Sequence, residues 1–148
     1  MKCPFCRQTD TEIYNSRATK FATQTWRRRR CQNCSKLFTT YESPDLSFLR
    51  IKRPQTAKTI PYSRAKLFSG LYQAFLDVPR KDATIDAVTD TIEVKVLDLQ
   101  QPEITTTDLA AIILTTLKHF NTAAFLRYLA SHAELATNRQ LKQELKKY

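Results

Sequence analysis

Residues 3–6 read CPFC and residues 31–34 read CQNC, and the second motif directly follows an arginine run, RRRR at 27–30. A two-residue spacer lets both sulfurs of one turn point at a metal ion about 2.3 Å away. Two such motifs supply four thiolates, which form a closed, structural zinc site with no position left for water. We therefore predict that one structural Zn²⁺ is bound by Cys3, Cys6, Cys31 and Cys34.

The same cysteines have a second possible chemistry, which is disulfide formation. Disulfides persist in secreted proteins, whereas this sequence begins MKC with no apolar run before the first cysteine. A redox-active pair also fits poorly, because a thioredoxin-like site uses one pair beside a helix rather than two matched motifs. Arg7 and Ser35 follow the two motifs at positions where a positive φ is expected. Strain of about 1 kcal/mol at each is small beside metal binding of ~10 kcal/mol.

The positive charge of the chain is concentrated in its first part. Residues 1 to 60 hold 13 of the 24 Lys and Arg and 4 of the 14 Asp and Glu, a net charge of +9, while the remainder carries only +1. Subtracting about two charges for a zinc–thiolate centre leaves this part strongly basic, so its natural partner is a polyanion. No stretch approaches the ~18 consecutive apolar residues of a membrane span, and we expect a cytoplasmic protein with no membrane partner.

Three short strands are predicted in the cysteine-bearing part, at 12–17, 23–30 and 37–41, because these segments are rich in β-branched and aromatic residues. Side chains alternate along a strand, so Arg27 and Arg29 share one face and Arg28 and Arg30 share the other. A thin ribbon has no thick core, and we expect all four guanidinium groups to stay in water. The alternative is an ordinary solvated face or an address signal. The predicted nucleic-acid-binding residues are Arg17, Lys20, Arg27, Arg28, Arg29 and Arg30.

The second part of the chain predicts a β-hairpin followed by four helices. The hairpin strands are 48–53 and 58–62, and Ser63 can cap a helix that carries Leu67, Leu71 and Phe75. A second helix is expected at 83–99, because apolar residues recur there at three- and four-residue spacings. The last of these residues is Leu99. Thr105 or Thr106 can cap a third helix with Phe120 on its apolar side, and Asn121 a fourth. The predicted fold class is α+β, with a zinc ribbon at 1–44, a second domain at 45–135 and a charged tail at 136–148.

These residues resemble a known family. CPFC at 3–6, NSR at 15–17, RRRRC at 27–31 and LFTTYE at 37–42 are similar to the zinc ribbon of the NrdR family. IKR at 51–53, PYSRAKL at 61–67 and AFLRY at 124–128 are similar to its ATP-cone. Members of this family are bacterial transcriptional repressors of ribonucleotide reductase operons.

The resemblance implies a nucleotide-sensing repressor associated with the bacterial nucleoid. In such proteins the cone binds ATP or dATP and changes the oligomeric arrangement, which sets whether paired ribbons grip a double-stranded DNA operator. The implied phosphate contacts are Lys52, Arg53 and Lys66, with Arg64 as a weaker candidate. Ile51 and Leu67 would line the base, with Phe125 and Tyr128 close to the pocket. Two departures stand out. The family's Asp-Gly turn is replaced by PQTA at 54–57, and Ile60 stands where the family carries a Glu that could read adenine or ribose.

Three other interpretations of the chain stay open at this point. It could be a zinc-ribbon protein that binds RNA or the ribosome, with its helical half as a protein-interaction module. It could be a dimerisation module without nucleotide sensing. The cone residues could also be structural, because Phe125 and Tyr128 lie at the spacing of a helix core and the cations could be ordinary surface charges. Enzymatic activity is not expected, since we find no nucleophile–base set, no Walker-type loop and no acidic cluster for Mg²⁺.

If the four arginines of each ribbon neutralise phosphates in a dimer, up to about eight contacts form. The logarithm of duplex DNA affinity should then fall against the logarithm of salt concentration with a slope of roughly −7. Fluorescence anisotropy of a labelled duplex between low and moderate salt measures this slope, and a flat response would contradict the interpretation.

Overall fold

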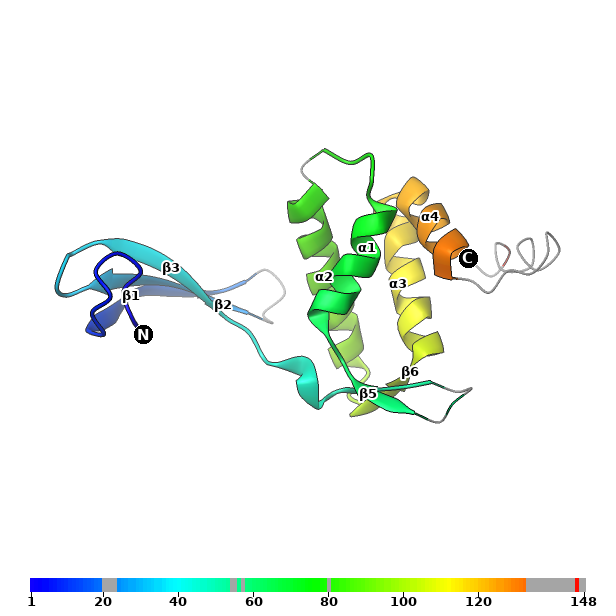
Figure 1. Ribbon diagram of the computed structural model, residues 1–148, viewed down its shortest axis with the longest axis horizontal. Helices are drawn as coiled ribbons and strands as arrows, with labels where there is room; N and C mark the ends of the chain where they lie inside the picture. The colour runs from blue at the N-terminus through cyan, green and yellow to red at the C-terminus, as the bar shows by residue number, and fades with distance from the viewer. Residues whose placement is uncertain (20–23, 54–55, 57, 80, 133–145, 147–148) are drawn as a thin grey trace. The chain divides into compact units, whose positions relative to one another are not determined.

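The protein is described by a computed structural model, which covers residues 1–19, 24–53, 56, 58–79, 81–132 and 146. The chain divides into two compact units, 1–45 and 46–148, one residue beyond the boundary expected from the sequence (Figure 1). The first unit is built of strands, and the second combines a small sheet with helices. The predicted α+β class is confirmed. The expected tail at 136–148 lies outside the described residues except for Lys146.

The first unit is a three-stranded antiparallel sheet in the order β1-β2-β3, with β1 at Thr11–Ala18, β2 at Thr25–Cys31 and β3 at Leu37–Glu42. A bulge interrupts the pairing of β1 with β2 between Ile13 and Asn15. Among the described residues of this unit, only Cys3 and Cys31 are buried. The described part of the unit therefore has no apolar core of its own, and a bond network through its cysteines has to hold it together.

The sheet of the second unit has three strands rather than the two of a hairpin. β4 (Arg50–Lys52) pairs antiparallel with β5 (Thr59–Pro61), as predicted, and parallel with β6 (Glu103–Thr105). The sequence predicted no strand at β6, between the second and third helices. Only one of its three side chains, Ile104, is buried, so the sequence shows no alternating pattern typical of a strand. The strand forms because β4 has an unpaired edge with which it can pair.

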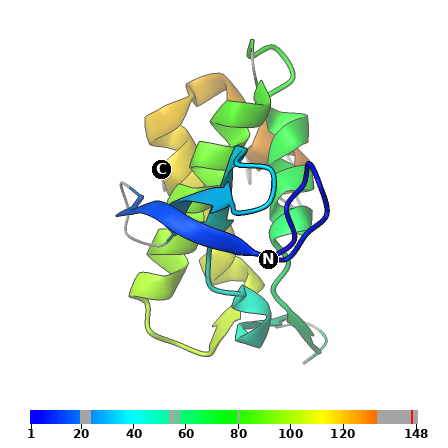
Figure 2. The same ribbon diagram turned by 90° about the vertical axis from the view of Figure 1, so that its left-hand side faces the viewer.

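Four helices complete the second unit, as predicted: α1 (Arg64–Ala74), α2 (Lys81–Asp98), α3 (Thr106–Phe120) and α4 (Thr122–His132). Each helix packs against two others, α1 with α2 and α4, and α3 with the same two, as Figures 1 and 2 show. A short 3₁₀ turn at Leu46–Phe48 precedes the sheet. Two apolar assignments were wrong, because Leu99 lies beyond the end of α2 and Phe120 ends α3, and both side chains are exposed.

Side-chain caps set where these helices begin. The Ser63 hydroxyl accepts from the Lys66 N–H at 3.4 Å at the start of α1. Thr105, rather than Thr106, caps α3 in a reciprocal capping box, in which Thr105 and Asp108 each accept from the other's backbone N–H. The Asp108 carboxylate also accepts from the Thr105 hydroxyl at 2.7 Å, and this hydrogen bond together with the one from the Thr105 N–H lowers the pKa of Asp108. The Asn121 side-chain oxygen, Oδ1, accepts from the Ala124 N–H at 2.9 Å at the start of α4.

The apolar core of the second unit draws on all four helices and the central strand. Its fully buried side chains include Leu71, Phe75, Ile85, Ile92 and Leu117. A domain of this size with a continuous core can fold without a metal ion. The two units therefore have different sources of stability.

We expect Leu71→Ala to destabilise the second unit by about 2–5 kcal/mol, because it leaves a cavity in a fully buried position of α1. Leu76→Ala is the matched control, since the Leu76 side chain is 56% exposed, and it should change the free energy of unfolding by about 0.5 kcal/mol or less. Urea unfolding followed by helical circular dichroism measures both, and equal effects would contradict this assignment of the core.

Candidate functional site

The two cysteine motifs fold into turns of the same design. The Arg7 N–H donates to the Cys3 carbonyl and the Ser35 N–H to the Cys31 carbonyl, both at 2.9 Å. Arg7 has φ 65° and Ser35 has φ 55°, which confirms the positive φ predicted from their places after the motifs. In each turn the backbone strain of a positive φ at a residue other than glycine is tolerated, because this conformation points both cysteine sulfurs in one direction.

The four sulfurs lie together at spacings that suit a metal ion. All four Sγ atoms are within 4.8 Å of one another. Cys3 Sγ lies 3.7 Å from Cys34 Sγ, and Cys6 Sγ lies 3.5 Å from Cys31 Sγ. A disulfide needs about 2.05 Å, and all four cysteines are free. A tetrahedron with metal–sulfur bonds of about 2.3 Å has edges of ~3.8 Å. The geometry therefore fits one structural zinc ion held by Cys3, Cys6, Cys31 and Cys34.

The thiols differ in how readily they release their protons. Hydrogen bonding from the backbone of Gln8, against some desolvation, lowers the pKa of Cys6 to about 6. The backbone of Lys36 alone would lower the pKa of Cys34, but desolvation and the neighbouring thiols together raise it to about 11. Four thiolates cannot stay this close without a counter-charge, and a divalent cation supplies that charge when it replaces the protons.

The arginine run occupies the central strand, β2, with alternate side chains on opposite faces, as predicted. Arg27 Nη2 lies 2.7 Å from a Glu42 carboxylate oxygen, and Arg29 Nη2 lies 3.8 Å from the other oxygen. Their side chains are only 26% and 13% exposed. The expectation that all four guanidinium groups stay in water was therefore wrong. Glu42 can be recognised as the partner of these arginines only when the strand register is known. In that register Glu42 lies opposite Thr25, on the same face as Arg27.

The other face of β2 holds its arginines differently. Arg28 Nη1 donates to the Thr39 hydroxyl at 3.0 Å. The Arg30 guanidinium carbon lies 5.1 Å from the Tyr14 ring centroid, and that of Arg17 lies 5.8 Å from the Trp26 ring centroid. These partners are neutral, so the positive charge of this face remains uncompensated by them. Lys20 lies outside the described residues.

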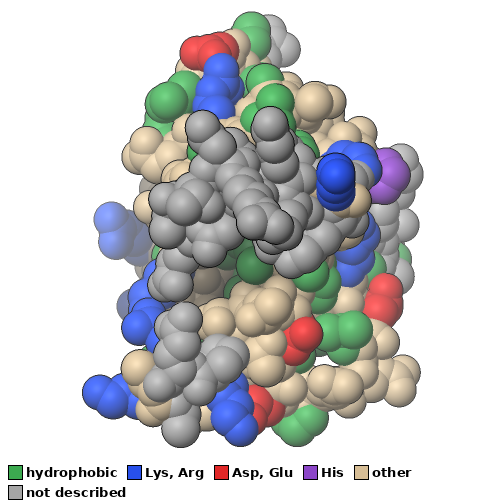
Figure 3. All heavy atoms as spheres, turned by 90° about the vertical axis from the view of Figure 1, so that its right-hand side faces the viewer, with side chains coloured by type: hydrophobic (Ala, Val, Ile, Leu, Met, Phe, Trp, Pro, Cys, Tyr) green, Lys and Arg blue, Asp and Glu red, His purple; other side chains and the backbone are tan. Residues whose placement is uncertain are grey.

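The predicted nucleotide-site residues separate into an internal and an external group. Four of them belong to the buried core of the second unit: Ile51, Leu67, Phe125 and Tyr128. Burial raises the pKa of Tyr128 to about 12. Lys52, Arg53 and Lys66 are exposed, and the Lys52 ammonium lies 3.8 Å from a Glu103 carboxylate oxygen. The loop 54–57 is described only at Thr56. Figure 3 shows Lys and Arg side chains on the lower part of one face and also higher up on the same face, beside a His side chain.

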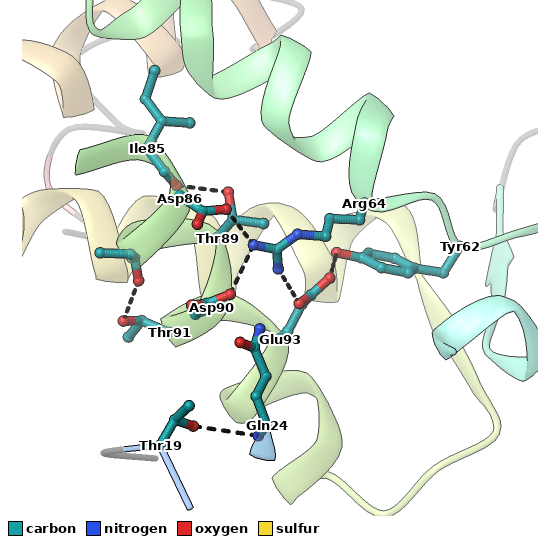
Figure 4. A network of polar contacts seen from close by, with 11 residues as sticks. Thr19, Gln24, Tyr62, Arg64, Ile85, Asp86, Thr89, Asp90, Thr91 and Glu93 are labelled. Carbon is teal, nitrogen blue, oxygen red and sulfur yellow. Dashed lines mark hydrogen bonds and ion pairs between the residues drawn. The ribbon is translucent and has the colours of Figure 1, made fainter. Parts of the chain in front are cut away.

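Arg64 does not point to solvent as a free phosphate contact would. Its guanidinium binds three carboxylates of α2, with Nη2 at 2.5 Å from Asp86 and 2.7 Å from Asp90, and Nη1 on Glu93 (Figure 4). Desolvation alone would lower the pKa of Arg64, but hydrogen bonding to Asp86 and the charges of Glu93 and Asp90 raise it.

The Tyr62 hydroxyl completes this network by donating to Glu93 at 2.9 Å. Desolvation and Glu93 raise the pKa of Tyr62. Sequence reasoning missed the network, although the acidic residues at 86, 90 and 93 recur at helical spacing.

No helix in the described part of the chain is long and apolar enough to cross a membrane.

Comparison with known proteins gives matches over both units. The family described as "Transcriptional repressor NrdR-like, N-terminal domain" matches residues 1–42, and the ATP cone domain matches residues 51–134. The chain is 36% identical over 128 residues to "Transcriptional repressor NrdR" of Polaromonas naphthalenivorans (strain CJ2), which covers 86% of this chain and 85% of that protein. Proteins of the same name from Lachnoclostridium phytofermentans (strain ATCC 700394 / DSM 18823 / ISDg) and Thermoanaerobacter sp. (strain X514) are 30% and 31% identical over 148 residues. These cover 99% of this chain and 95% and 92% of those proteins.

We expect Cys6→Ser to abolish stoichiometric zinc binding and unfold the ribbon, because the metal contributes ~10 kcal/mol to a unit whose described residues bury only Cys3 and Cys31. The helical signal of the second unit should be unchanged. Ser16→Ala, an exposed change on β1, is the control and should keep one zinc per chain. Elemental analysis and circular dichroism measure the two effects, and loss of helical signal in Cys6→Ser would show that the units are not independent.

Proposed function

This chain belongs to the family of NrdR transcriptional repressors, and from that premise we propose that it represses ribonucleotide reductase genes by binding an operator in double-stranded DNA. The family members named above are repressors rather than enzymes, in agreement with the prediction that this chain is not an enzyme. We also propose that the protein acts in the bacterial cytoplasm, at the nucleoid.

The observation that carries this proposal is the joining of two ligand-specific units in one chain. The ribbon presents an arginine-rich strand on a scaffold that the four cysteines fix, and the ATP-cone follows directly. Arginine donates to phosphate in a fixed, bidentate geometry, so a rigid strand can present several guanidinium groups to a nucleic-acid backbone at once. A single ribbon offers a small footprint, and we propose that paired ribbons in an oligomer bind the two boxes of an operator.

In the ATP-cone, which takes an adenine nucleotide as its regulatory ligand, we propose that Lys52, Arg53 and Lys66 contact the phosphates. Lys66 lies in the first turn of α1, where the helix dipole also favours an anion. Ile51, Leu67, Phe125 and Tyr128 keep 5–7% of their surfaces exposed and would form the floor beneath the base.

Arg64 has a different part in this proposal from the one the sequence suggested. It would have to leave three carboxylates to reach a phosphate, and such an exchange would leave Asp86, Asp90 and Glu93 facing one another without a cation. We therefore propose that Arg64 positions α1 against α2 and so sets the place of Lys66.

We expect ATP and dATP to change the molar mass of the protein in solution, because a regulatory nucleotide must favour one assembly over another. Size-exclusion chromatography with light scattering, with ATP, with dATP and with neither, measures this. The Lys66→Ala variant should need at least about tenfold more nucleotide for the same change in molar mass, since a charge-assisted hydrogen bond contributes about 1.5–3 kcal/mol to binding.

Lys118→Ala is the matched control for Lys66→Ala, because Lys118 is equally exposed but lies at the far end of α3. It should respond to nucleotide as the unaltered protein does. An unchanged mass in all three conditions, with no nucleotide retained in equilibrium dialysis, would contradict the proposed regulation.

A further inference from the structure

We infer that the ribbon binds DNA with one face only, the face that carries Arg17, Arg28 and Arg30, and that Glu42 withdraws Arg27 and Arg29 from the interface. This inference rests on the proposed function, because it assigns the residues with which the ribbon would contact its duplex. It divides a run of four identical residues into two pairs with different roles.

The strand register separates the two pairs. Arg28 lies between Asn15 and Thr39, and Arg30 lies between Glu12 and Leu37. Arg17 lies opposite Trp26, which is two residues from Arg28 and so shares its face. We call this side, with Arg17, Arg28 and Arg30, the open face. Arg27 and Arg29 lie on the opposite side, where the Glu42 side chain also projects, and we call that side the Glu42 face.

The positive charges on the Glu42 face, those of Arg27 and Arg29, are already paired with the Glu42 carboxylate. One carboxylate lies within 4 Å of both guanidinium groups, and Arg29 also donates from Nε to the Thr40 hydroxyl at 3.1 Å. A DNA phosphate would have to displace Glu42 to gain the same contacts. The exchange breaks an existing ion pair for each new one and leaves the Glu42 carboxylate without its cations, so the gain in binding free energy is small.

The open face holds its guanidinium groups without neutralising them. The Arg30 guanidinium lies over the Tyr14 ring and that of Arg17 over the Trp26 ring, both at cation–π distance, while Arg28 donates one N–H to the Thr39 hydroxyl. A cation–π contact holds a guanidinium beside a neutral ring and uses none of its N–H groups as a donor to a carboxylate.

One carboxylate, Glu12, also lies on the open face, opposite Arg30 in the register. Within the described part of the chain it forms no ion pair with Arg17, Arg28 or Arg30. The cations of this face are therefore ordered in advance and remain available to phosphate.

This assignment changes the expected salt dependence. Three arginines on each of two paired ribbons give up to six phosphate contacts, and a slope of about −5 rather than the roughly −7 expected for eight contacts. Substituting Arg28 and Arg30 should remove up to four of these contacts, whereas substituting Arg27 and Arg29 should remove almost none.

The test uses the full-length zinc protein and a labelled 30-base-pair duplex of mixed sequence, because the backbone term does not depend on the operator. We expect R28A/R30A to bind at least about tenfold more weakly at 50 mM salt and to flatten the slope by about 3 to 4. The R27A/R29A variant should change the slope by less than about 1. Each variant is used only with one zinc per chain. An equal or larger loss in R27A/R29A would overturn the face assignment.

Glu42→Gln provides a second test that removes no arginine. It frees Arg27 and Arg29, so duplex affinity should stay unchanged or rise several-fold. A loss of threefold or more would show that the Glu42-bound arginines are part of the interface, and would overturn the inference. If the unaltered protein binds no duplex, or prefers the single strand of the same length, the proposed function itself fails, which is a different result from a loss confined to the wrong pair.

Discussion

The attraction between a divalent cation and four thiolates is the interaction on which the first unit depends. That unit buries only two described residues, and both are cysteines. An exposed sheet of three strands without an apolar layer cannot offset the conformational entropy of its own ordering. The zinc site closes the long loop between Cys6 and Cys31 and fixes the sheet at one end, so the arginine strand acquires a defined shape. The second unit needs no such ion, because its helices bury a continuous core.

Electrostatic pairing inside each unit decides which cations remain available for ligands. In the ribbon, one carboxylate of β3 engages two arginines of β2. In the ATP-cone, three carboxylates of α2 engage one arginine of α1. Both sets involve side chains that a count of positive charge treats as free. The chain therefore presents fewer available cations than its 24 Lys and Arg side chains suggest, and those that remain are placed more selectively.

Much of this architecture could be predicted from local signals. The cysteine spacing predicted the zinc site. The starts of three helices were predicted from their capping residues, because a cap depends on a few neighbouring residues; these are Ser63, Asn121 and the pair Thr105 or Thr106. β6 could not be predicted, since three residues with one buried side chain acquire strand structure only by pairing with β4. The roles of Glu42 and Arg64 were equally hidden. Both depend on partners far along the chain, which no local pattern in the sequence brings together.

The parallel pairing of β4 with β6 has a mechanical consequence. Lys52, at the end of β4, is the ladder neighbour of Thr105, and Thr105 is also the residue that caps α3. β6 runs into α3 without an intervening loop, so the backbone beside Lys52 and the first turn of that helix behave as one stiff joint. We therefore expect a displacement of the central strand to move the first turn of α3, a helix that packs against both α2 and α4. Because α3 is 15 residues long, a small rotation of its first turn would move its far end by a larger distance. This coupling runs through the backbone and requires no chain of side-chain contacts.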